Sequence, residues 1–451
     1  MWQFLKKNLL AVLFVYLSVF TILGSSALNN LVPFPRFAQQ IFSAMLYMPF
    51  RLMVLGKIFC DLKRFRVSGF NVLYYILFIY YFALTVYRVN SPASPAMEST
   101  LYAVVLFGVL ALYSLITEGR LGPIRETLQR NILIIACYFI ALKVIFTFLE
   151  GRLFSHLPIN NLYSTSLLVI LLPFLADTMK NGESKKAKLS CVLMTLAVAL
   201  VFVCSSRAIV TLSLIVLVTL FLLHIKTLAM VKRLLAAVSA ALVLVAVAAT
   251  LNVGIVRYSL VREFSLLSSI IPIGKTDVSM IEGEDPWDMI GAQNQIGRSD
   301  AMRAQLMKQG LDEVWKNPIF GTGDLYYTYD LGYKTMEQTA HNFIIESLVC
   351  FGIVGTLMII ALLLNILRQF GFFRRKTFRS WRIWVYILVI SLYYLALGMV
   401  QPSVYNTLLC PMFFIGLAYY GERLLPVRDR APKPTVCLLG KRKGLLNVGE
   451  E

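Results

Sequence analysis

Long apolar stretches recur along this chain, each near the roughly 20 residues that an α-helix needs to cross a membrane. Their apolar residues run continuously, whereas lipid-facing barrel strands would alternate apolar with polar residues. We therefore predict an all-α fold class, a polytopic membrane protein with about 12 transmembrane helices. The expected spans are 9–28, 41–60, 69–87, 101–117, 132–149, 161–179, 190–206, 208–225, 234–254, 342–367, 383–400 and 407–420.

The composition supports an integral membrane protein. Hydrophobic residues make up 58% and charged residues 15% of the chain, whereas soluble domains have about 45–50% apolar and about 25% charged residues. The formal net charge is +19, from 43 Lys and Arg against 24 Asp and Glu. Such a charge could indicate a nucleic-acid partner, so its distribution decides its meaning.

The basic residues gather in the connections expected on the cytoplasmic side. Each short external loop carries one at most, namely Arg36, Arg88, Arg152 or Arg207. This positive-inside pattern places both termini in the cytoplasm. The surplus of positive charge on the cytoplasmic side faces anionic membrane lipid, so no nucleic-acid partner is needed to explain it. The N-terminus resembles a signal peptide, with Lys6 and Lys7 before an apolar run, and we interpret it as a retained first helix.

One external loop stands apart by its length. The predicted organisation is residues 1–254 with transmembrane helices 1–9, a periplasmic loop domain at 255–340, transmembrane helices 10–12 at 341–420, and a basic cytoplasmic tail at 421–451. Loops this long are usually functional or disordered. Trp287 and Trp315 indicate that this one is folded. None of the seven cysteines falls in it, which excludes a disulfide scaffold or a cysteine zinc site there.

The loop contains one clear helix, predicted over 299–316. Ser299 and Asp300 suit its cap and first turn, and Asn317-Pro318 ends it. We expect its apolar stripe either to pack against the membrane domain or to lie in the membrane interface. We interpret Gly321-Thr-Gly323 as a plain turn, since phosphate-binding loops need more glycines and a following helix. The stripe comprises Ala304, Met307, Leu311, Val314 and Trp315.

Three residues are candidates for chemistry by their position. Arg298 precedes the predicted helix N-terminus, where free backbone N–H groups and a guanidinium suit an anion. The alternative is a surface arginine that pairs with acidic residues of the loop. Arg207 occupies the shortest connection between two spans, as a functional charge or as a snorkelling hinge residue. His341 stands where the loop re-enters the membrane, as a general base or as a polar interface residue.

Other polar residues have weaker signals. Asn342 and Glu346 lie four apart on one helix face, so they could orient substrate or simply pack together, and Arg303 is a further possible supporting residue. Arg51 and Lys143 lie near mid-span, where they could pair with Asp177 or Glu346 or face a substrate.

A metal site is the main alternative for the external loop. The acidic residues Glu282, Glu284, Asp285 and Asp288 could bind a divalent ion. They include no Asp-x-Asp pair, so we favour a solvated acidic turn and expect neither metal nor cofactor.

Taken together, the motifs resemble the O-antigen ligase and O-antigen polymerase superfamily of bacterial envelope glycosyltransferases. The residues that carry the resemblance are Ser205-Ser206-Arg207-Ala208, Gly297-Arg298, Trp315 to Gly323, and His341-Asn342 followed after nine residues by Gly352 and Gly355. They cover roughly 205–210 and 297–355. The remaining chain matches only in hydropathy and in the number of spans.

The resemblance implies a function. The superfamily transfers a glycan from undecaprenyl diphosphate, at the periplasmic face of the bacterial inner membrane, onto a sugar hydroxyl. Lipid A core is the acceptor in the ligase branch, and a second lipid-linked repeat unit is the acceptor in the polymerase branch. Twelve spans with one large loop between spans 9 and 10 resemble the ligase more closely.

The residue chemistry is consistent with that function. A diphosphate leaving group needs cations, which Arg207 and Arg298 would supply, and an acceptor hydroxyl needs a base, which His341 would supply. This set implies direct attack with inversion and without a metal. A transporter of lipid-linked glycans is the alternative from another class, because twelve spans and mid-span charges also suit that group. The external position of the largest loop and the absence of a matching pair of broken helices in the sequence argue against it.

Overall fold

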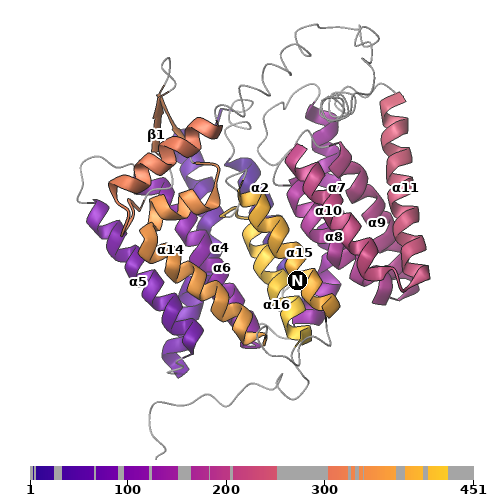
Figure 1. The fold of residues 1–451 in the computed structure, drawn as a ribbon, viewed down its shortest axis with the longest axis horizontal. Coiled ribbons are helices and arrows are strands. Elements are labelled where there is room, and N and C mark those ends of the chain that lie inside the picture. Colours follow the sequence, from indigo (N-terminus) through magenta and orange to yellow (C-terminus); the bar gives the residue numbers. More distant parts are fainter. Residues whose placement is uncertain are drawn as a thin grey trace, which may run out of the picture.

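The computed structural model describes most of the membrane part of the chain (Figure 1). The described residues are 4, 7–24, 33–64, 68–89, 96–120, 124–150, 164–181, 183–203, 207–250, 303–323, 327–330, 335–338, 340–371, 381–399 and 405–424. The long helices among them are α2 (Leu9–Leu23), α4 (Arg36–Arg64), α5 (Gly69–Val89), α6 (Ala96–Thr117), α7 (Ile124–Glu150), α8 (Ser164–Asn181), α9 (Ser184–Phe202), α10 (Arg207–His224), α11 (Leu228–Thr250), α14 (Phe343–Gln369), α15 (Trp381–Gly398) and α16 (Leu409–Leu424).

Every predicted span overlaps one of these helices, so the predicted helical class is confirmed for this part of the chain. Helix ends differ from the predicted ends by several residues, most at the starts of α7, α9 and α11, because polar residues continue the helix beyond its apolar stretch. Six of the helices, α4, α5, α7, α11, α14 and α15, are long and apolar enough to cross a membrane. The full count of twelve spans stays a prediction.

Helices that follow one another in the chain alternate in direction, as the predicted topology requires. We call the end of the bundle at which α10, α14 and α16 begin the hairpin face. The last turn of α2 reaches this face, since Thr21 Oγ1 lies 3.4 Å from Thr407 Oγ1 just before α16. At the opposite face, His224 Nε2 lies 2.7 Å from the Tyr386 hydroxyl, which joins the end of α10 to the start of α15.

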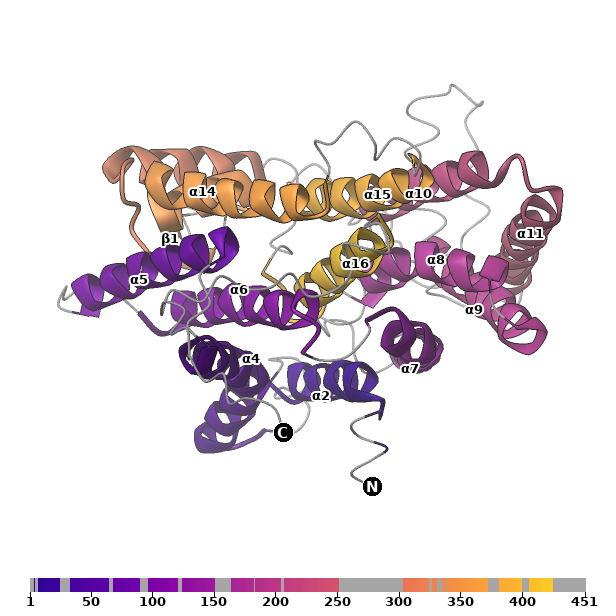
Figure 2. The same ribbon diagram turned by 90° about the horizontal axis from the view of Figure 1, so that it is seen from below.

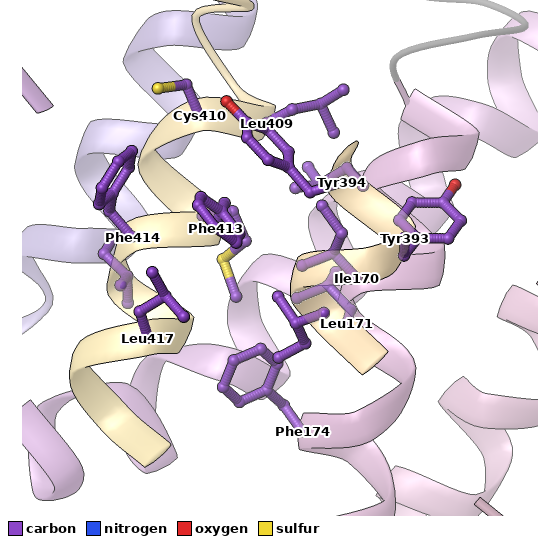
Figure 3. Close-up of a cluster of buried hydrophobic side chains, with 14 of the residues drawn as sticks. Ile170, Leu171, Phe174, Tyr393, Tyr394, Leu409, Cys410, Phe413, Phe414 and Leu417 are labelled. Carbon is purple, nitrogen blue, oxygen red and sulfur yellow. The ribbon is translucent and has the colours of Figure 1, made fainter. Parts of the chain in front are cut away.

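The core lies around α16, whose side chains are almost all buried. Figure 2 shows α16 between α6 and α8, and Figure 3 shows apolar side chains of α8, α15 and α16 interdigitating. Tyr394 of α15 stacks on Phe413 of α16 with ring centroids 4.1 Å apart and planes at 8°. Lipid is as apolar as these residues, so van der Waals packing holds the helices together here.

Two buried ion pairs join helices close to the opposite face. Lys57 of α4 donates to Asp61 at 2.9 Å and to Asn71 of α5 at 2.6 Å. Arg423 of α16 donates to Asp177 of α8 at 2.7 Å. Both pairs satisfy charges that would be costly alone in a membrane.

The mid-span basic residues differ from each other in their surroundings. Lys143 of α7 is fully buried, whereas Arg51 of α4 is exposed. Asp177, one of the acids considered as their partner, binds Arg423 and the hydroxyl of Tyr419.

Within the long loop the structure adds a β-hairpin to the predicted helix. Strands β1 (Tyr327–Asp330) and β2 (Thr335–Gln338) pair antiparallel, with Tyr327 opposite Gln338. The Tyr-Thr-Tyr sequence of β1 consists of residue types that strands favour. The hairpin is a short local departure from the predicted all-α class, and it lies beside the start of α14 in Figure 1.

The predicted loop helix is present at residues 303–316, and its first predicted residues, 299–302, are not among those described. The predicted apolar stripe divides into two. Val314 is buried and Met307 is partly buried, together with Leu306, against the first turns of α14. Leu311 and Trp315 are exposed beside them.

Candidate active site

His341 stands immediately before α14 in an unusual backbone conformation. Its φ of 52° is the one positive value for a non-glycine residue in the described part of the chain. Such a conformation costs roughly 1–3 kcal/mol and is often found at functional sites. The surrounding structure must therefore hold it in place.

Asn342 provides part of that support as the N-cap of α14. Its Oδ1 accepts from the backbone N–H of Ile344 at 3.0 Å and of Ile345 at 3.3 Å. This cap satisfies two of the N–H groups that every helix start leaves free. Its Nδ2 lies 4.0 Å from the sulfur of Met307 in the loop helix. Asn342 therefore has an observed structural role beside the predicted base.

The loop helix packs across the start of α14 and brings a cation to it. Leu306 and Val314 form a buried cluster with Ala340, Ile345 and Val349. Arg303 precedes Leu306 by three residues, and at 100° per residue it falls on the same helix face. The structure thus brings Arg303, predicted only as possible support, to the side of the helix that faces His341.

Burial and, as the smaller cause, the positive charge of Arg303 together lower the pKa of His341 to about 4. Both causes disfavour the imidazolium form. At neutral pH the side chain is therefore the neutral imidazole, which can accept a proton.

The helix that follows His341 is broken at Gly352. This residue has φ 61° and ψ −172°, a conformation essentially limited to glycine, and it interrupts the hydrogen bonds of α14. Loop residues 317–323 fill the break. We call this loop, together with residues 349–354 of α14, the clamp.

Four main-chain hydrogen bonds join the two sides of the clamp, and they involve the amides and carbonyls that the break releases. Thr322 N donates to Val349 O at 2.7 Å, and Gly323 N donates to Cys350 O at 2.8 Å. In the other direction, the amides of α14 donate to the loop: Ile353 N to Pro318 O at 2.9 Å, and Val354 N to Ile319 O at 3.1 Å. Backbone groups at membrane depth must be satisfied within the protein, and this exchange does so.

Close backbone approach explains both glycines of the clamp. A Cβ on Gly352 would lie 2.4 Å from Gly321 N, and one on Gly321 would lie 2.4 Å from Gly352 N. The hydroxyl of Tyr80 in α5 lies 2.8 Å from Phe320 O and 2.9 Å from Phe351 O, so it can donate to either. The Gly-Thr-Gly segment was interpreted as a plain turn; it also locks the loop to α14.

The two predicted functional arginines are only partly placed. Arg207 is the first residue of α10, so its backbone lies on the hairpin face, the face at which α14 begins; its side chain is not described. Arg298 belongs to residues 251–302, outside the described part of the chain, as do the acidic residues considered for a metal. The distances from either arginine to His341 stay untested.

Glu346 is buried in the first turn of α14, where the helix dipole favours a carboxylate. Its backbone N–H donates to Asn342 O at 2.8 Å. The next residue, Ser347, lies 3.2 Å from the hydroxyl of Tyr405, close to the start of α16. These contacts tie the polar start of α14 to its neighbours. Within the described residues no group of three or more His, Cys, Asp or Glu could hold a metal ion.

Comparison with protein families decides the assignment. Residues 190–360 match the family described as O-antigen ligase. These residues form a domain similar to the O-antigen ligase family. This domain extends from α9 to the middle of α14 and includes Arg207, Arg298 and His341, so the resemblance inferred from the motifs is confirmed. No curated protein and no solved structure matches the chain.

The family gives the coarse function. An O-antigen ligase domain in a chain with several membrane-spanning helices indicates a multi-pass membrane enzyme of the glycosyltransferase type, with ligase or polymerase activity on O-antigen. The clamp and the pairing of His341 with Arg303 are features of this domain that the motifs alone did not reveal.

Proposed function

We propose that the protein is an O-antigen ligase of the bacterial inner membrane, with both termini in the cytoplasm and the hairpin face in the periplasm. It transfers a glycan from undecaprenyl diphosphate to a sugar hydroxyl of lipid A core. One observation carries the proposal: a neutral histidine, His341, is held in a strained backbone beside Arg303, at the face where α10 begins with Arg207.

In the proposed reaction His341 acts as the general base. It takes the proton of the acceptor hydroxyl as the oxygen attacks the anomeric carbon from the side opposite the diphosphate. The carbon–oxygen bond to the diphosphate breaks, and its electron pair stays on the leaving oxygen. The configuration at the anomeric carbon inverts. His341 then releases its proton to water or to the departing diphosphate.

The arginines stabilise the charge that develops on the leaving group. Arg207 and Arg298 would contact the diphosphate, Arg207 next to the free N–H groups at the start of α10. Arg303 would add a third positive charge close to the base. A bound diphosphate would offset that charge and raise the pKa of His341, so the base strengthens when the donor is present.

Substitution tests the roles of these residues. Arg207→Ala, Arg298→Ala and His341→Ala should each give a folded, inserted protein without glycan transfer, measured with purified enzyme, lipid-linked oligosaccharide and lipid A core. Arg36→Ala is the matched control, because Arg36 is an exposed arginine at the start of α4 on the same face. Wild-type transfer by purified His341→Ala would eliminate the base assignment.

A choice of acceptors tests the reaction itself. In reconstituted vesicles the ligase should extend lipid A core in preference to a second lipid-linked repeat unit. The reverse preference would assign the polymerase reaction. Movement of the lipid-linked glycan across the bilayer without transfer would instead identify a transporter.

A further inference from the structure

The loop helix and the clamp carry an exposed apolar surface that packing inside the protein does not use. Leu311, Trp315, Ile319 and Phe320 are 45%, 77%, 56% and 56% exposed. We call these four residues the apolar edge. Single exposed apolar side chains need no explanation, but four that follow closely along one segment do.

The spacing places the apolar edge beside the packed face of the loop helix. At 100° per residue Leu311 and Trp315 follow the buried arc of Leu306 and Val314 directly. Lys308 and Asp312, which are exposed and polar, begin the next arc. A helix with one arc on the protein, the next arc apolar and the remainder polar is arranged to lie at a boundary between lipid and water.

The clamp joins this edge to a surface that already faces lipid. Ile353 donates its amide to Pro318, which precedes Ile319, so the two isoleucines are neighbours across the clamp. From Ile353 an exposed apolar stripe continues down α14. That stripe belongs to a helix long and apolar enough to cross a membrane. Its members are Ile353, Leu357, Ile360 and Leu364.

Clamp geometry also fixes the depth of the edge. Gly352 lies nine residues into α14, about 13 Å along the helix axis. Main-chain hydrogen bonds and the Tyr80 hydroxyl of α5 hold Ile319 and Phe320 at this depth along α14. Trp315 lies in the last turn of the loop helix, just before the loop. Tryptophan is the residue that membrane interfaces favour most, because its ring is apolar and its N–H is polar.

We propose that the apolar edge inserts into the outer boundary of the bilayer on the hairpin face, so that the loop helix is a membrane-embedded element rather than part of an aqueous domain. The occupant of this surface is membrane lipid. Arg303 is on the packed face of the loop helix, and His341 is at the start of α14 against which that face packs. A substrate anchored in the membrane would therefore reach both residues laterally, from the lipid. The membrane contact does not depend on which reaction the site performs.

Fluorescence quenching by lipid tests the proposal. The protein is reconstituted into vesicles whose acyl chains are brominated near the headgroup, with Trp315 as its one tryptophan after Trp2, Trp287, Trp381 and Trp384 are changed to phenylalanine. Emission from Trp315 should fall severalfold relative to vesicles of unbrominated lipid. In the matched control, Trp315→Phe with Lys316→Trp, the probe is at an exposed polar position about 100° further round the same helix, and its emission should stay nearly constant.

Two results would overturn the proposal. Unquenched emission at long wavelength would place Trp315 in water, and unquenched emission at short wavelength would mean that protein covers it. If the tryptophan variants fail to fold, nitroxide labels on Phe320→Cys and Asp312→Cys in a cysteine-free background replace them. The label at 320 should collide with oxygen severalfold more than with a water-soluble nickel complex, and the label at 312 should show the opposite preference. Equal behaviour of the two labels would refute membrane insertion.

Discussion

Replacing Gly352 with alanine should open the clamp without unfolding the membrane helices. The new Cβ would lie 2.4 Å from Gly321 N, 2.4 Å from Ile319 O and 2.5 Å from Phe320 C, all backbone atoms that no side-chain rotation can move. The residue would also have to keep φ 61° and ψ −172°. Loop and helix must therefore separate, or α14 must straighten, and either change breaks the bonds between them.

The magnitude follows from the contacts that are lost. Four main-chain hydrogen bonds contribute about 0.5–1.5 kcal/mol each, or about 2–6 kcal/mol in all. Retaining them with alanine would require backbone strain of about 1–3 kcal/mol in addition to the collision. A destabilisation of about 3 kcal/mol already changes an opening equilibrium about a hundredfold.

Hydrogen exchange measured by mass spectrometry in lipid nanodiscs checks this prediction. The amides of Thr322, Gly323, Ile353 and Val354 should exchange about a hundredfold faster in Gly352→Ala, because local opening exposes them. Glycan transfer should fall, since the loop helix that carries Arg303 loses its anchor.

Gly119→Ala is the matched control for backbone strain. Gly119 also has a positive φ, of 72°, but a Cβ there would meet no atom within 4 Å. It should cost some thermal stability and leave exchange in the clamp unchanged. If Gly352→Ala exchanged like the wild type at the clamp amides, the four bonds would not be what holds the loop, and the reasoning would be refuted.

Three further predictions concern the base, a buried ion pair and metal dependence. The acid limb of the pH profile of kcat/KM should reflect His341 with a pKa of about 4, so that activity rises with pH. Arg303→Gln should move that limb to higher pH, because it removes a positive charge near His341. An unmoved limb would contradict the proximity of Arg303 to His341. Since the folded pKa is below the unfolded value of about 6.5, the contribution of His341 to stability is complete above that pH and is lost as pH falls towards 4, as a denaturation series in micelles would record. Lys57→Met should destabilise by about 3–5 kcal/mol by leaving Asp61 buried without its cation, and adding Asp61→Leu should restore most of the loss; no recovery in the double variant would mean that the pair is not the cause. Glycan transfer should survive excess EDTA, and its loss would point to a metal.

The helices could be predicted well because the membrane leaves few choices for the backbone. Any apolar stretch of about 20 residues must satisfy its N–H and C=O groups internally, so hydropathy alone located each helix. The break at Gly352 was beyond this reasoning, because the apolar stretch 342–367 continues across it without a change in pattern. The partners of the freed backbone groups come from a loop that is near in space and carries no hydropathy signal.

The site was predicted in its components but not in its geometry. His341 was found because it is a histidine at a membrane boundary inside a motif. Its neutral state follows from burial and from Arg303, and neither can be read from spacing along the chain. Asn342 shows the reverse case, since it was predicted only to orient substrate or to pack with Glu346, whereas the structure shows that it is the helix cap, a role that an asparagine just before an apolar run commonly has.

The clamp connects the glycines of the motif to the chemistry of the site. Main-chain atoms form four hydrogen bonds of the clamp, and the Thr322 hydroxyl also donates to Val349 O. Most other side-chain changes in residues 317–323 should therefore be tolerated, whereas a Cβ at Gly321 or Gly352 should not. The loop fixed by the clamp continues directly from the loop helix, and the packed face of that helix sets where Arg303 stands relative to His341. Gly352 lies about 13 Å further along α14 than the base. It therefore influences the base through the backbone geometry of the clamp. A motif that pairs a histidine with a distant glycine specifies both the reacting group and the break that holds its neighbouring charge in place.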